Sequence, residues 1–467
     1  MSQAAAAADM PPLARRTAPG VMPLLSVMMF IQFFIWGAWY VSMGPFMATH
    51  GMGSSIGRAY TLAPLAAIVS PFFLGMIADR FFASQRVLLV MHLLGAAAMF
   101  AIPYVTPATV PNVDPTKPAV MAPGESSFGF LALVFVHSLF YMPTINLTNS
   151  VSFAHLTNQE KQFPLVRVFG TLGWIAAGLL ISALAFDVSA KQFHVAGAAA
   201  VGLALFSFVL PHTPPPAKGR KASVREVLGV DAFSLFRSRS FAVFALSSFL
   251  ICIPLAAYYS FAAATVKTVM LVNDPANPNP PFTAWMQVGQ GAEVVFMLIM
   301  PFFFRRLGVK WMLATAMLAW VARYALFAAG VTGPSFVLIM LGVALHGICY
   351  DFFFVTGFIY TDKRAAKQIA AQAQGLIVLL TYGLGLAIGG YVMGELYNNI
   401  VGDKVGRDAL PLLQKFWIWP AALAAVVLVI FAALFRDDTK EPPIGPRSTA
   451  DGSVARGEAA SATAGAA

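Results

Sequence analysis

Three charged residues interrupt long apolar stretches of this sequence: Glu293, Arg323 and Asp351. A charge at the centre of a lipid bilayer costs about 2.5–3.5 kcal/mol on insertion scales, so such side chains face a bundle interior or a water-filled cavity. A carboxyl group that is withdrawn from water readily binds a proton, which makes Glu293 and Asp351 candidate proton carriers. The alternative is that each carboxylate forms a permanent ion pair with Arg167 or Arg323.

Two sets of polar and aromatic residues recur at helical spacing. Gln290 precedes Glu293 by three residues, so the two side chains share one face of a helix. Arg167, Thr171 and Trp174 occupy positions i, i+4 and i+7, which also form a single stripe. Both stripes predict the wall of a cavity that binds a flat, polar solute. For the second stripe, the alternative is that Arg167 anchors the helix at the cytoplasmic surface while Trp174 faces lipid.

Other polar side chains inside apolar stretches are further candidates for the same cavity. Gln32 shares a broad helical face with Trp36. Because Trp also lines membrane interfaces, Gln32 is the stronger candidate of the two. His346 lies one turn before Tyr350, close to Asp351.

Signatures of soluble enzymes are missing from the sequence. It contains no Walker A loop, no glycine-rich dinucleotide fingerprint after a strand, no Cys-x-x-Cys pair and no His-Glu-x-x-His motif. We therefore expect no enzymatic activity, no cofactor and no metal site. Without an ATP site, uphill transport would have to draw on an ion gradient.

The composition places these residues in a membrane. Of the 467 residues, 58% are hydrophobic and only 11% are charged, whereas soluble domains carry about 25% charged residues. A soluble monomer with this composition would expose more apolar surface than such proteins tolerate. The formal net charge of +10 could suggest nucleic acid, but most Lys and Arg residues fall in alternate loops between apolar stretches. They are therefore topology signals, and we expect no nucleic-acid partner.

A helix that spans a bilayer needs about 20 mostly apolar residues. Twelve stretches meet this length and predict an all-α membrane protein with twelve transmembrane helices in two six-helix halves. The expected spans are 22–48, 56–79, 86–105, 128–153, 166–186, 193–211, 240–266, 283–304, 310–330, 335–360, 373–396 and 415–435. Because the basic residues gather in the loops on the side of both chain ends, the positive-inside rule predicts that both termini are cytoplasmic.

The longest polar stretch inside the chain separates the sixth and seventh spans. It covers residues 212–239, begins with a Pro-rich segment and carries several Lys and Arg residues, and we interpret it as a cytoplasmic linker. It follows an N-terminal bundle at 22–211 and precedes a C-terminal bundle at 240–435. Residues 1–21 are expected to be a cytoplasmic tail, and residues 436–467 a disordered cytoplasmic tail because of their bias towards small and polar residues.

Several short blocks of the sequence resemble the nucleoside:proton symporter family of the major facilitator superfamily. These blocks occur in chain order between about residues 25 and 435, at Phe30–Trp39, Tyr141–Thr144, Phe163–Gly173 and Asp351–Phe353. The resemblance implies a major facilitator fold and a central nucleoside site between the two halves, with uptake driven by protons.

Position by position, the resemblance also implies roles for individual residues. Arg167 and Thr171 match substrate-binding residues of the bacterial nucleoside permeases, and Trp174 stands where those proteins have Phe. Gln290 and Glu293 match a pair on the eighth helix that contacts the nucleoside.

On the tenth helix, Asp351 matches an acidic residue of the permeases to which proton coupling is ascribed. Tyr350 stands where the permeases have Phe. Ala256 and Tyr259 align with a Gln and an Asn that the permeases offer from the seventh helix, and His346 replaces a Tyr. Because buried polar partners set selectivity, these departures bear on which nucleoside or related ribosylated compound is carried.

The sequence thus predicts a proton-coupled nucleoside importer that works by alternating access, as a monomer in the bacterial inner membrane. Its expected substrate-binding residues are Gln32, Arg167, Thr171, Trp174, Tyr259, Gln290, Glu293, His346 and Tyr350, and its expected proton-coupling residues are Glu293 and Asp351. An alternative with the same fold is a proton-coupled exporter of aromatic or amphipathic molecules, because Met- and Phe-rich helices suit a promiscuous pocket. A third possibility is a non-transporting membrane sensor or an intramembrane enzyme, although sensors usually carry a soluble output domain.

Overall fold

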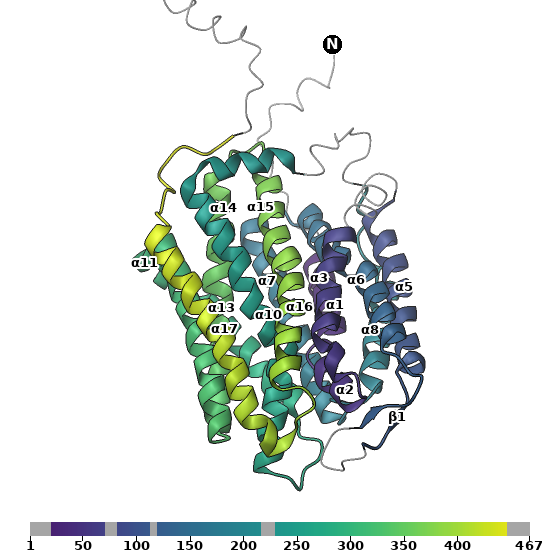
Figure 1. Cartoon of the computed structure of the whole chain (residues 1–467). Coiled ribbons are helices and arrows are strands. Elements are labelled where there is room, and N and C mark those ends of the chain that lie inside the picture. The colour runs from purple at the N-terminus through teal and green to yellow at the C-terminus, as the bar shows by residue number, and fades with distance from the viewer. Residues whose placement is uncertain (1–19, 71–81, 113–118, 216–228, 446–467) are drawn as a thin grey trace, which may run out of the picture.

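The computed structural model describes residues 20–70, 82–112, 119–215 and 229–445. Long helices run side by side through this part of the chain, and a short hairpin of β1 (Thr109–Val110) and β2 (Val120–Met121) lies at one end of them (Figure 1). Eight of the described helices are long and apolar enough to cross a membrane. The architecture is therefore that of a helical membrane protein, as the composition predicts.

The helices of the N-terminal half pack closely against one another. Their bounds are α1 (Val21–Gly37), α2 (Met43–Thr49), η1 (Gly53–Ser55), α3 (Ile56–Ser70), α5 (Ser84–Val105), α6 (Phe128–His155), α7 (Gln159–Ala183) and α8 (Lys191–Phe206). In α7, Gly173 lies so close to the carbonyl of Phe30 in α1 that no Cβ would fit. Small residues of this kind let helix backbones approach each other in membranes, and here they fix α7 against α1.

The C-terminal half continues the same arrangement with longer and more irregular helices. Its elements are η3 (Val230–Arg237), α10 (Arg239–Asn273), α11 (Phe282–Thr332), α12 (Phe336–Ala344), α13 (His346–Tyr350), η4 (Asp351–Val355), α14 (Thr356–Arg364), α15 (Ala370–Val378), η5 (Leu379–Gly385), α16 (Leu386–Ile400) and α17 (Gly406–Leu434). The eighth and ninth predicted spans both fall within α11, and Gly308 turns the chain between them. Its φ of 65° lies in the left-handed region that favours glycine.

Two wide helical turns interrupt the tenth and eleventh predicted spans. Both η4 and η5 have π-helical hydrogen bonding, and such turns occur frequently at functional sites. The first begins at Asp351 and the second contains Tyr382. Each turn shifts the direction of the side chains that follow it, which a regular helical periodicity would not predict.

The twelve predicted spans fall mainly on these helical segments. Residues 71–79 of the second span lie outside the described residues, as do residues 216–228 of the expected linker and residues 1–19 of the N-terminal tail. The remainder of the linker includes η3, which packs against α15.

The two halves meet along α3 and α16 and along α7 and α11. Gly57 of α3 and Gly394 of α16 touch so closely that neither has room for a Cβ. Next to this contact, Arg58 Nη2 lies 3.3 Å from Glu395 Oε1. This contact region lies at the end of the bundle opposite the start of α1 and the last described residues (Figure 1).

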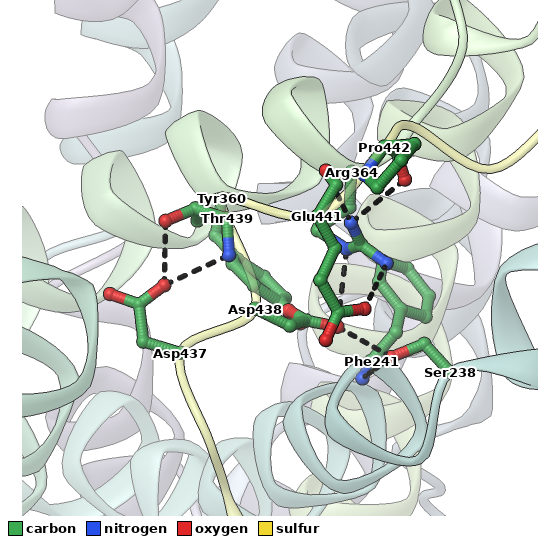
Figure 2. A network of polar contacts seen from close by, with 9 residues as sticks. All are labelled: Ser238, Phe241, Tyr360, Arg364, Asp437, Asp438, Thr439, Glu441 and Pro442. Carbon is green, nitrogen blue, oxygen red and sulfur yellow. Dashed lines mark hydrogen bonds and ion pairs between the residues drawn. The ribbon is translucent and has the colours of Figure 1, made fainter.

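The expectation of a disordered tail from residue 436 onward is wrong for residues 436–445. We call these residues the C-terminal strap, because they lie across the ends of α10 and α14 (Figure 2). Asp438 accepts hydrogen bonds from Ser238 Oγ and Tyr360 Oη, both at 2.7 Å, and its Oδ2 lies 3.2 Å from Arg364 Nε. The backbone of the strap adds a further contact, because Ile444 pairs with Ala365, directly after the end of α14, in an isolated β-bridge. Residues 446–467 lie outside the described residues.

Candidate transport site

A pocket with an empty volume of about 690 Å³, counting space open to solvent, lies between the two halves. Its walls come from α1, α7, α10, α11, α13, η5, α16 and the turn after α1. The lining residues are Phe33, Trp36, Tyr40, Arg167, Gly170, Thr171, Trp174, Tyr259, Gln290, Glu293, His346, Tyr350, Tyr382 and Leu386.

The structure brings eight of the nine predicted substrate-binding residues to this pocket. They are Arg167, Thr171, Trp174, Tyr259, Gln290, Glu293, His346 and Tyr350. The stripe on α7 therefore faces the pocket, and the alternative of a lipid-facing Trp174 with Arg167 as a surface anchor does not describe this structure.

Gln32 is the predicted residue that the structure does not bring to the pocket. It is fully buried, and its Nε2 donates a hydrogen bond to Thr144 Oγ1 at 2.8 Å. Its Oε1 lies 3.0 Å from His92 Nε2, and its backbone carbonyl accepts a hydrogen bond from Tyr141 Oη at 2.6 Å. Gln32 thus joins α1 to α5 and α6 inside the N-terminal half.

The two candidate proton carriers differ in their surroundings. Glu293 lines the pocket, and its Oε2 lies 3.8 Å from His346 Nε2. Asp351 does not line the pocket; it is fully buried at the start of η4, and within the described part of the chain neither of its oxygens has a hydrogen-bond partner. Such an unpartnered buried carboxyl invites a functional explanation.

The candidate arginines make contacts with aromatic rings instead of carboxylates. The guanidinium carbon of Arg167 lies 4.1 Å from the centroid of the Phe33 ring. That of Arg323 lies 4.0 Å from the centroid of Tyr258, and its Nε donates to the carbonyl of Gly342 at 3.1 Å. No ion pair between these arginines and Glu293 or Asp351 is present among the described residues. The alternative of permanent ion pairs is therefore not what the structure contains.

Aromatic side chains from both halves close one wall of the pocket. The rings of Trp36 and Trp174 meet edge to face with centroids 5.4 Å apart. Tyr40 and Tyr259 meet across the two halves with centroids 6.1 Å apart. Sequence reasoning placed Trp36 no further than a helical face shared with Gln32, because Trp also lines membrane interfaces.

Tyr382 is a pocket residue that the sequence argument missed. Its hydroxyl hydrogen-bonds to that of Tyr350 at 2.6 Å, and its ring packs on Phe354 with centroids 4.8 Å apart. The available signal was a phenol hydroxyl within an otherwise apolar, Gly-rich stretch. The π-helical turn decides which way Tyr382 faces, and this turn has no recognisable signature in the sequence.

A pocket between two helical membrane halves, lined by aromatic side chains and a few polar groups that include the Glu293 carboxyl, is the arrangement expected of a secondary transporter. Comparisons with known proteins agree. The family model described as nucleoside H+ symporter matches residues 20–440. The chain belongs to the nucleoside H+ symporter family.

Relatives of known name are transporters and permeases, not enzymes. The putative nucleoside transporter YegT of Escherichia coli (strain K12) is 37% identical over 430 residues, covering 89% of this chain and 94% of that protein. The xanthosine permease of the same organism is 31% identical, covering 87% of this chain and 94% of the permease.

Solved structures confirm the prediction of a major facilitator fold. The crystal structure of the nucleoside transporter NupG superimposes with a TM-score of 0.75 at 28% identity, covering 89% of this chain and 99% of that chain. A bacterial homologue of the human lysosomal transporter Spinster, in an inward-facing conformation, gives a TM-score of 0.67 at 13% identity, covering 92% and 98% of the two chains. The second likeness concerns the fold alone.

Proposed function

We propose that this protein imports nucleosides across the bacterial inner membrane together with protons. The observation that carries the proposal is the pocket between the halves, which joins a carboxylate, an amide, a guanidinium and several aromatic rings. This combination suits a nucleoside, because aromatic side chains stack on the π-face of any nucleobase while polar groups bind the sugar. The printed names of the relatives, which include a xanthosine permease, point to the same class of solute.

Within this proposal, each wall of the pocket has a distinct task. Trp174 and Tyr350 stack on the base. Gln290 and Glu293 exchange hydrogen bonds with the hydroxyl groups of the ribose, and Arg167 donates to oxygen or nitrogen acceptors on the solute. Thr171, Tyr259 and His346 complete the substrate contacts.

Proton coupling is assigned to Glu293 and Asp351. A carrier whose loaded form must reorient in lipid gains from neutralising its buried carboxylates, since a buried charge is costly. Protonation of these two groups would let the loaded carrier reorient towards the cytoplasm, where the carboxyl groups would then release their protons. The two halves then rock about the central site by alternating access.

The proposed orientation places both termini in the cytoplasm. The first and last described residues lie at the same end of the bundle (Figure 1). Near the last described residues, Arg364 pairs with Glu441, and the neighbouring Lys363 lies over the ring of Phe304, which directly precedes Arg305 and Arg306. Cytoplasmic loops are enriched in such basic residues. We further propose that the protein acts as a monomer, because one chain supplies every wall of the pocket, and that it has no nucleic-acid partner, because its basic residues serve as topology signals.

The purified protein in proteoliposomes offers the direct test of substrate class. With an outside-acidic pH gradient, labelled uridine, adenosine or xanthosine should accumulate inside, and a protonophore should abolish the accumulation. Accumulation of none of a full nucleoside panel would overturn the substrate assignment. Accumulation only with the opposite gradient would instead indicate an exporter that exchanges solute for protons.

A further inference from the structure

The first turn of α11 is capped by side chains from the other half of the molecule. Pro281, at the N-cap position, makes no side-chain cap of its own. The backbone N–H of Thr283 donates to Asp187 Oδ1 at 3.0 Å, and the N–H of Ala284 donates to Ser182 Oγ at 2.9 Å. Ser182 Oγ also donates to Asp187 Oδ1 at 2.7 Å. We call Ser182 and Asp187 with the two amides the outer latch.

This arrangement connects the halves because Ser182 lies at the end of α7 and Asp187 follows it, whereas α11 belongs to the C-terminal half. The first amides of a helix have no partner within the helix, and a carboxylate at this end also interacts favourably with the helix dipole. Asp187 is only 1% exposed. It also interacts electrostatically with Lys267 of α10, which adds a second attraction between the halves.

The chain around Asp187 is held in an unfavourable conformation. Ala185 has a φ of 54° and is the one non-glycine residue with positive φ in the described part of the chain. Residues with a Cβ rarely adopt this region, because the Cβ then lies too close to a carbonyl oxygen. Asn279 Nδ2 of the C-terminal half donates to the carbonyl of Ala185 at 3.2 Å. The strained turn is therefore stabilised across the same interface that holds the latch.

The outer latch lies close to one end of the pocket. A smaller cavity, lined by Ala263 and Met286 together with Tyr259 and Gln290, continues from the pocket. Met286 follows Thr283 by three residues, and Gln290 follows it by seven, which is about 10 Å along the helix. The latch therefore lies at the end of the pocket opposite the described chain ends, on the helix that carries Gln290 and Glu293.

We propose that the outer latch is the gate on the outer side of the pocket and that Asp187 is its positioning residue. The cap that Asp187 places on α11 exists only while the pocket is closed to the outside. Opening to the outside separates α7 from α11, leaves the first amides of α11 without these partners and releases the strained turn at Ala185. Loss of the cap should therefore shift the protein towards outward-open states. The proposal rests on alternating access in the proposed function, but it does not depend on which solute is carried.

The gate is tested by the accessibility of a reporter thiol. Cys252 and Cys349 are replaced by Ala, and Ala263→Cys is introduced in the cavity beneath the latch. In right-side-out vesicles, Asp187→Ala should raise the rate of labelling by a membrane-impermeant maleimide about 2- to 30-fold, the factor that corresponds to the loss of a helix cap. Asp187→Asn should raise it less, because an Asn side chain can still cap the helix.

Asp274→Asn is the matched control, since Asp274 is an exposed carboxylate on the loop that leads to α11 within the C-terminal half. Its labelling rate should equal that of the parent. An unchanged rate in Asp187→Ala, in protein that elutes as a single folded peak, would overturn the gate. Because the readout needs neither nucleoside nor a proton gradient, a failure to transport nucleosides would leave this result interpretable.

Discussion

At the scale of single residues, Glu293 and Asp351 differ in their surroundings and therefore in their expected roles. Glu293 faces the pocket within reach of His346, so it can contact both the solute and a proton. Asp351 is buried beside the pocket with neither oxygen hydrogen-bonded within the described residues, so a proton is its natural partner. The surroundings of the two carboxyl groups thus predict different behaviour on neutralisation.

We expect Glu293→Gln and Asp351→Asn each to reduce uphill uptake of nucleoside to near background, because an amide cannot release a proton. Asp351→Asn should retain exchange of internal for external nucleoside, since Asp351 does not line the pocket. Glu293→Gln should lose affinity as well. The measurements are gradient-driven uptake and counterflow in proteoliposomes. If both variants accumulate nucleoside like the parent at acidic and neutral pH, the carboxyl groups are structural.

Gln32 and Gln290 provide a paired comparison of a structural and a binding amide. Gln32→Ala should lower stability by about 1–3 kcal/mol, because it leaves buried groups such as His92 without a partner, and it should leave KM nearly unchanged. Gln290→Ala should raise KM about 2- to 10-fold, the equivalent of one hydrogen bond, with little change in melting temperature. Melting curves and uptake kinetics separate the two effects, and a reversed pattern would refute the assignment.

At the scale of helices, close contacts between glycines set how the halves meet. Gly57 of α3 touches Gly394 of α16 without room for a Cβ, and such contacts are typical of packed membrane helices. The C-terminal strap has a comparable role at the other end, where Asp438 ties α10 to α14. Each contact thus holds one helix that lines the pocket, α16 in the first case and α10 in the second.

Gly57→Ala should hinder closure at the outer end and lower the maximal uptake rate several-fold, since the added methyl group would collide with the backbone of α16. Gly53→Ala is the control, because open space surrounds the position of its Cβ. Uptake rates and folded yield of both variants are compared. Equal rates in the two variants would show that the α3–α16 contact tolerates separation.

Asp438→Ala should destabilise the C-terminal half by about 3–5 kcal/mol, the usual cost of removing one partner from a buried ion pair. The variant leaves the buried Arg364 without its closest carboxylate. Asp437→Ala, which removes an exposed neighbouring carboxylate, should change the melting temperature little. Thermal denaturation of the purified variants tests this, and similar melting temperatures would mean that the strap is dispensable.

At the scale of the whole molecule, the sequence could predict whatever depends on the alternation of apolar and polar residues. The spans follow from hydropathy. Eight of the nine predicted substrate-binding residues lie at the pocket; most of them follow from the cost of placing polar groups in lipid, whereas Tyr259 came from the family resemblance. The same cost does not distinguish a polar group that faces a cavity from one that bonds to another helix, and for this reason Gln32 was misplaced. Tyr382 and the strap depend on a π-helical turn and on partners about 80 residues away, which no local pattern contains.

The central claim is that nucleoside and proton enter together. Proteoliposomes loaded with a trapped pH indicator and held without any pH gradient provide the measurement: external nucleoside is added while internal pH and labelled nucleoside are followed together. Coupled entry predicts that the interior acidifies in step with nucleoside uptake, and that Asp351→Asn acidifies the interior less for each nucleoside taken up. Nucleoside entry in the parent protein with constant or rising internal pH would contradict proton symport.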